Sequence, residues 1–94
     1  MTEHETDIKC SLEQYGKSPS ARVAKIGSLE IYFSYDTPIA FLGSDGKLVV
    51  SENRWGSTTG RHIASLDVAK RDRMPSEQFD AELHMHIRNM LREV

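Results

Sequence analysis

The chain lacks most features that reinforce small proteins covalently. Its 94 residues include one cysteine, Cys10, so no disulfide can form within the chain. A single thiol near the N-terminus is typical of a reducing compartment. No apolar run approaches the ~20 residues that span a bilayer, and no apolar stretch long enough for a signal peptide precedes Ile26. We therefore expect a cytoplasmic protein that enters no membrane and needs no cofactor.

Apolar residues and net charge are also scarce. The apolar share is 38% and the formal net charge is −2. A chain of this length can form one domain with its own core. The low apolar share predicts modest stability and leaves room for a homodimer that buries more apolar surface. The slightly negative charge argues against broad, sequence-independent binding of nucleic acid.

The segment 21–51 has the pattern of an antiparallel sheet. Apolar and polar residues alternate over Ser28–Tyr35, which indicates a strand, and a shorter strand near Val23–Ile26 precedes it. The apolar runs Ile39–Leu42 and Lys47–Ser51 flank the Asp-Gly pair of a tight hairpin. Because both runs are apolar at adjacent positions, we expect a central strand that is covered on both faces.

Asp36–Pro38 predicts a turn between these strands, because a proline cannot donate to the sheet ladder. The aromatic residues of the strands are mostly candidates for the core: Tyr32, Phe33, Tyr35 and Phe41.

The pattern becomes helical after Trp55. The hydroxyl groups of Ser57–Thr59 can cap a first helix, in which Ile63 and Leu66 recur at roughly helical spacing. Pro75 and Ser76 can open a second helix. Its apolar stripe has spacings of three and four and consists of Phe79, Leu83, Ile87, Met90, Leu91 and Val94.

Residues 1–20 are polar, acidic and aperiodic. We expect them to form a flexible N-terminal segment with at most one short helical turn at Ser11–Gly16. The predicted domain, residues 21–94, belongs to the α+β class: an antiparallel sheet of three to four strands, a meander with an Asp-Gly hairpin, followed by two C-terminal helices.

The polar stretch Glu52–His62 is the predicted working surface. Once its hydroxyl groups are assigned to helix capping and its tryptophan to the edge of the core, four candidates for binding a protein partner remain: Asn53, Arg54, Arg61 and His62. Glu77 and Asp80, at the start of the second helix, are candidates to meet a basic surface of that partner.

The histidines suggest no catalytic or metal site. An imidazole titrates near neutral pH, but a general base needs a nucleophile within reach, and the sequence places none at a workable spacing from His62. We therefore predict a surface or capping role for His62. His84 and His86 would share a face on a strand, but on the predicted helix they lie about 200° apart, so they cannot hold one metal ion together. His84 is expected to pair with Asp80 or Arg88.

A basic central segment supports an alternative function. A small nucleic-acid-binding regulator would use its five cationic side chains: Arg54, Arg61, Lys70, Arg71 and Arg73. Asp72 and flanking acids weaken that patch.

Three short motifs, IYFSYDTPIAF (31–41), LVVSENRW (48–55) and TTGRHI (58–63), occur in order. Together they resemble a family of small uncharacterised proteins carried by viruses and plasmids of microbes. The resemblance implies no reaction and no catalytic residue. It implies a viral or phage accessory protein, of the kind that includes anti-CRISPR inhibitors of host defence. We therefore expect a non-catalytic protein-interaction module whose partner is a host nucleic-acid-targeting complex.

Overall fold

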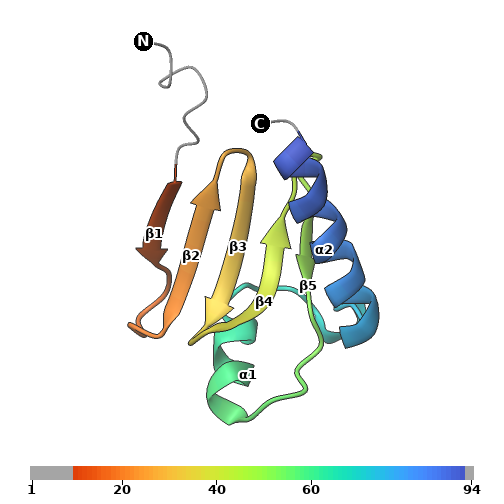
Figure 1. Cartoon of the computed structure of the whole chain (residues 1–94). Coiled ribbons are helices and arrows are strands. Elements are labelled where there is room, and N and C mark those ends of the chain that lie inside the picture. Colours follow the sequence, from red (N-terminus) through yellow and green to blue (C-terminus); the bar gives the residue numbers. More distant parts are fainter. Residues whose placement is uncertain (1–9, 93–94) are drawn as a thin grey trace.

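The computed structural model describes residues 10–92 and contains one sheet and two α-helices (Figure 1). The elements are, in order, β1 (Cys10–Gln14), β2 (Ala21–Ile26), β3 (Leu29–Ser34), β4 (Thr37–Leu42), β5 (Leu48–Val50), α1 (Ser57–Ala64), the short 3-10 helix η2 (Lys70–Asp72) and α2 (Ser76–Arg92). The strands pair antiparallel in the order β1-β2-β3-β4-β5. The predicted α+β class is confirmed, with five strands where three or four were expected.

The additional strand is β1. The prediction of a helical turn at Ser11–Gly16 is wrong. Residues 11–14 form a strand that pairs antiparallel with residues 22–25 of β2. Within the described residues, the sheet thus includes the chain from Cys10, before the expected start of the domain at Ala21. All five side chains of β1 are exposed, so the strand is held by its backbone pairing and leaves no apolar periodicity in the sequence. Residues 1–9 of the expected flexible segment lie outside the described residues.

Each face of the sheet carries one helix. The core beneath α2 contains Leu29, Ile31, Phe41, Val49, Phe79 and Leu83. The core beneath α1 contains Ile39, Ala40, Val50 and Ile63. The central strand β4 contributes to both, and its Ile39, Ala40 and Phe41 have no exposed surface. The prediction of a strand covered on both faces is confirmed.

The two helices leave part of the sheet uncovered. Figure 1 shows α2 alongside β4 and β5, whereas β1 lies at the opposite edge. Leu12 of β1 pairs with Ala24 of β2, which pairs with Ile31, so the three side chains lie in one row on the α2 face. Ile31 is buried, but Leu12 at the outer end of the row is 61% exposed.

The turns differ in how well they were predicted. The Asp-Gly hairpin between β4 and β5 is confirmed, and Gly46 takes the positive φ of +78° that this turn requires. The turn expected at Asp36–Pro38 is present but begins one residue earlier and ends before Thr37. The chain reverses over Tyr35 and Asp36, with Tyr35 at φ 55°, and Pro38 already belongs to β4. This backbone carries the Tyr35 side chain into solvent, where it is 61% exposed instead of joining the core.

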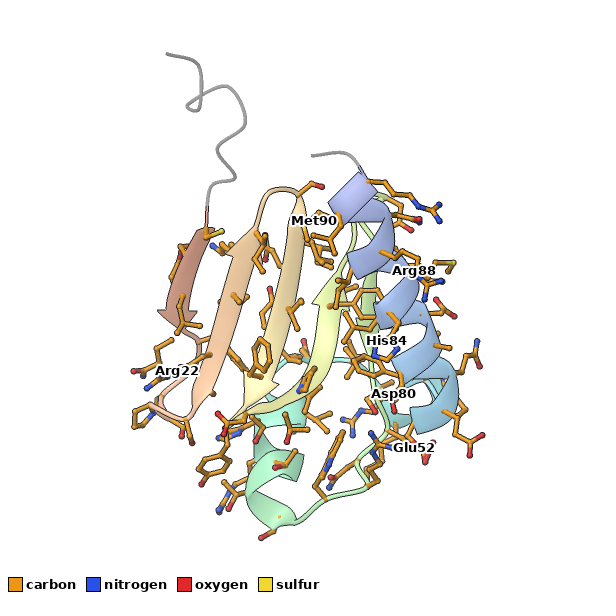
Figure 2. The ribbon with its side chains drawn as sticks, in the orientation of Figure 1. Arg22, Glu52, Asp80, His84, Arg88 and Met90 are labelled. Atoms are coloured by element: carbon orange, nitrogen blue, oxygen red, sulfur yellow. The ribbon has the colours of Figure 1, made fainter. Side chains whose placement is uncertain are left out.

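The helices begin close to the expected positions, but their details differ. Gly56 caps α1 with no side-chain hydrogen bond, so the capping role expected for Ser57–Thr59 is wrong. The start of α2 at Ser76 is confirmed. Figure 2 places Met90 on the side of α2 towards β3, in agreement with its packing against the core. Leu91, which the predicted stripe includes, is 59% exposed, so its place in the stripe is wrong. Val94 lies outside the described residues. Among residues 10–92, no helix has the length and apolar character that crossing a bilayer requires.

Candidate functional site

A buried polar cluster joins β3 to α1. The hydroxyl oxygen of Ser34 lies 2.6 Å from Nδ1 of His62 and 2.9 Å from the hydroxyl oxygen of Thr59. Ser34 is 1% exposed, Thr59 9% and His62 6%. Because burial keeps water away from these three side chains, they form hydrogen bonds with one another instead.

The turn geometry of α1 explains this cluster. Thr59, His62 and Ile63 are spaced three and four residues apart, so they share the helix face that packs on the sheet. Ile63 fills the apolar core, and the two polar residues beside it meet the Ser34 hydroxyl. The prediction that His62 lies on the surface is wrong, because α1 packs this face inward.

Ser34 and His62 are hydrogen-bonded as in a catalytic serine–histidine pair, but a substrate cannot reach the Ser34 hydroxyl. A hydroxyl that attacks a substrate must be reached by it, and only 1% of Ser34 is exposed. Among the described hydrogen bonds, no carboxylate orients the His62 ring. The geometry favours a structural role in fixing α1 on the sheet.

A pocket of about 540 Å³ opens next to His62. It lies between the turn that connects β1 to β2 and the side of α1. Its lining consists of Tyr15, Gly16, Lys17, Ser18, Ala21, Thr58, Arg61, His62 and Ser65. Tyr15 is half-buried in this wall, and its hydroxyl donates to the backbone oxygen of Phe33 over 3.2 Å. Burial, and secondarily the proximity of Tyr32, raises the pKa of Tyr15 to about 12.

The other candidates for partner binding gather around the loop before α1. Asn53 accepts a hydrogen bond from the backbone of Trp55 over 2.9 Å and donates to the Gly56 oxygen over 3.4 Å, so its amide shapes this loop. Arg54 lies over the indole of Trp55, with 4.9 Å from its guanidinium carbon to the ring centroid. Trp55 packs against the core beneath α1, as predicted.

An ion pair connects this loop to α2. The guanidinium of Arg54 lies 3.2 Å from a carboxylate oxygen of Asp80, and both side chains remain nearly half exposed. Figure 2 shows Asp80 and Glu52 at the same end of α2. Asp80 thus pairs with Arg54, where the sequence suggested His84 as its partner. Glu77 is exposed in the first turn of α2.

The basic residues of the alternative hypothesis are spread over three places. Arg54 is paired with Asp80, and Arg61 lines the pocket beside His62. The others lie in or beside η2: Lys70 and Arg71 are exposed, while Arg73 donates to the Val68 oxygen over 3.1 Å.

The two neighbouring histidines of α2 have separate surroundings. His84 is exposed, whereas the ring of His86 packs 4.9 Å from that of Phe41, measured between centroids. Their position within α2 excludes a shared metal ion, as the spacing predicted. Within the described part of the chain, no group of three or more metal-ligating side chains is close enough to hold an ion.

A protein-family model matches residues 6–81. The chain belongs to that family, which is described as a family of unknown function (DUF8033). The match covers the whole sheet, α1 and the start of α2, so it includes the Ser34 cluster, the pocket and the Arg54–Asp80 pair. No curated protein and no solved structure matches the chain.

Sequence reasoning missed Lys17 and Tyr15 as neighbours of His62. Both belong to the segment that we expected to be flexible, and only the pairing of β1 with β2 brings them beside α1.

Proposed function

We propose that this protein is a non-catalytic protein-interaction module that binds an extended segment of a partner protein along β1. The observation that carries the proposal is the outer edge of β1 along residues 11–14, which has a sheet neighbour on one side only among the described residues. Such an edge offers backbone N–H and C=O groups to an added strand. The opposite edge of the sheet is shielded, because Met74 bonds through its backbone to Val50 and Glu52.

The side chains next to this edge suit a partner segment with apolar residues. Leu12, Ala24, Phe33 and Tyr35 line a shallow hollow of about 300 Å³ on the face that α2 leaves uncovered, and the charged residues Arg22 and Asp36 complete its lining. Leu12 and Tyr35 are each 61% exposed. The one charged residue of β1, Glu13, is on the other face and pairs with Lys25 over 3.4 Å, so it does not repel a partner strand here. Strand pairing would supply affinity, and the hollow would supply specificity.

The resemblance to proteins of viruses and plasmids gives the proposal its more specific form. In that setting the partner would be a host nucleic-acid-targeting complex, and binding would inhibit host defence. The exposed charges near the start of α2, on Arg54, Glu77 and Asp80, would form a second contact. Since the Arg54–Asp80 pair is solvated, exchanging it for contacts with a partner costs little.

The test is affinity capture from lysate of the natural host, with the full chain as bait in three forms. Leu12→Lys places a charge in the hollow, whereas the matched control Ser11→Lys places it one residue away on the opposite face. We expect a protein that the wild type and Ser11→Lys recover and Leu12→Lys does not. Equal recovery by all three, or recovery of no specific protein, would count against the proposal.

A second copy of the chain is the competing occupant of the edge. Two β1 strands can pair across a two-fold axis, which would give a homodimer. Sedimentation equilibrium of the wild type distinguishes this outcome: a dimer that Leu12→Lys dissociates would assign the edge to self-association.

The nucleic-acid alternative rests on η2, where Lys70, Arg71 and Arg73 lie close together. Lys70 and Arg73 line one hollow of about 450 Å³. Such binding would produce a mobility shift that weakens steeply with salt. The absence of a shift at ~50 mM salt would remove this alternative.

A further inference from the structure

We propose that the pocket between the β1–β2 turn and α1 binds a small organic phosphate of the size of a nucleoside monophosphate. This inference does not depend on partner binding at β1. The pocket lies on the α1 face of the sheet, whereas the hollow beside Leu12 lies on the α2 face.

The charged side chains that line this pocket are all basic. Lys17 comes from the β1–β2 turn and Arg61 from α1, and no carboxylate belongs to the lining. Neither cation forms an ion pair within residues 10–92, unlike Arg54 and Lys25, which are paired with Asp80 and Glu13. Two unpaired cations on opposite walls favour an anion between them, and a guanidinium matches the oxygens of a phosphate.

A hydroxyl group and an imidazole add donors around the same space. Of the three hydroxyls in the wall, Ser65 donates to the His62 backbone oxygen over 2.6 Å and Ser18 lies 2.8 Å from the hydroxyl of Ser20, so the donor for a ligand is Thr58. The Nδ1 of His62 is occupied by Ser34, which leaves Nε2 as the ring nitrogen for a ligand in the pocket. If Thr59 donates to Ser34 and Ser34 donates to Nδ1, then Nε2 carries the proton and can donate to a phosphate oxygen. The buried cluster thus serves to hold the imidazole in one orientation.

The volume of the pocket and the apolar part of its wall favour an organic phosphate over an inorganic anion. A volume of about 540 Å³ falls within the range of ~300–1,000 Å³ typical of small-molecule sites. The half-buried ring of Tyr15 and the buried Ala21 add aromatic and aliphatic surface. A ligand that suits both parts has a phosphate group attached to a compact, partly apolar body.

The experiment is calorimetric titration of the full chain with the common ribonucleoside 5′-monophosphates. Two parallel titrations separate the parts of the ligand: inorganic phosphate lacks the organic body, and the nucleosides lack the phosphate. We expect a nucleoside monophosphate to bind more tightly than inorganic phosphate and than its own nucleoside, with an affinity that falls as salt is added.

Variants assign that binding to the pocket. Arg61→Gln and Lys17→Gln each remove one cation from an exposed position, so the fold is expected to persist, which circular dichroism checks. Each should weaken binding about tenfold, as expected for the loss of a charge-assisted hydrogen bond. The matched control is Arg71→Gln, which makes the same charge change on η2, outside the pocket, and should leave the affinity unchanged.

Three outcomes would overturn the proposal. The first is no binding of any of these monophosphates at millimolar concentration. The second is equal binding of nucleoside and nucleoside monophosphate, which would make the phosphate irrelevant. The third is a loss of affinity in Arg71→Gln as large as in Arg61→Gln, which would indicate non-specific attraction to positive charge.

Discussion

The ring of His86 in α2 lies directly against the backbone of Gly43 at the end of β4. A Cβ atom at position 43 would come within 2.6 Å of Cε1 and 2.8 Å of Nδ1 of that ring. The same ring packs against Phe41, 4.9 Å away between centroids. A side chain at position 43 would therefore have to displace His86 from its place on the core.

This contact predicts a coupled pair of substitutions. Gly43→Ala should lower the free energy of unfolding by about 1–3 kcal/mol, which is typical of overpacking. In a His86→Ala background the same substitution should cost much less, because the ring that it meets is gone. Urea denaturation of the four chains of this double-mutant cycle measures the coupling, which should be at least ~0.5 kcal/mol. Independent, additive effects would show that His86 does not occupy this position in solution.

The apolar stripe of α2 contains positions that the structure separates. Leu83 is 5% exposed, whereas Leu91, also in the predicted stripe, is 59% exposed. Leu83→Ala should cost ~2–5 kcal/mol through the cavity that it leaves. Leu91→Ala should change stability by no more than ~0.5 kcal/mol. Thermal or urea unfolding of the two variants checks this, and similar costs would mean that α2 extends its packing beyond Met90.

The fold was predictable wherever burial follows a simple period. The alternation in β3 and the spacing of three and four in α2 identify those elements, because one face of each is buried. The hairpin is identified by its Asp-Gly pair and by the continuous apolar run of β4, which is buried on both faces. The strand β1 has no buried face, since all five side chains are exposed, so no local pattern separates it from a loop. Its existence depends on the backbone of β2, which is a tertiary property.

The candidate site was less predictable because its contacts are distant in the sequence. Ser34 and His62 are 28 residues apart, and Arg54 and Asp80 are 26 apart. Helical spacing places His62 relative to its neighbours in α1, but it does not show which face of α1 meets the sheet. For the same reason, Lys17 could not be assigned to the wall opposite Arg61.

The hydrogen bonds of Ser34 to Thr59 and His62 predict that removing the Ser34 hydroxyl destabilises the fold. Ser34→Ala removes the hydroxyl that contacts both Thr59 and His62, and it leaves buried polar atoms short of a partner. We expect a loss of about 1–3 kcal/mol in the free energy of unfolding. Ser57→Ala is the matched control, because Ser57 is exposed on the same helix that Ser34 contacts. If both variants unfold at the same urea concentration as the wild type, the cluster does not hold α1 on the sheet.

The phenol of Tyr15 predicts how stability changes at alkaline pH. Burial, followed by the nearby Tyr32, raises its pKa to about 12, above the ~10 of a tyrosine in an unfolded chain. Below both values the phenol is neutral in both states, so its contribution to stability is fully present. From about pH 10 to about pH 12 the unfolded chain loses this proton more readily than the folded chain, so the free energy of unfolding should fall as pH rises.

The experiment compares this fall between the wild type and a variant that lacks the phenol hydroxyl. Tyr15→Phe should flatten that fall, measured by urea denaturation across this pH range. The loss of the hydrogen bond to the Phe33 oxygen lowers the overall stability of Tyr15→Phe by about 1 kcal/mol, so the comparison concerns the slope with pH. Tyr32, whose pKa is also raised by burial and by its hydrogen bond to Glu30, accounts for the part of the slope that remains. If the free energy of unfolding of Tyr15→Phe falls with pH as steeply as that of the wild type, the burial of this phenol is contradicted.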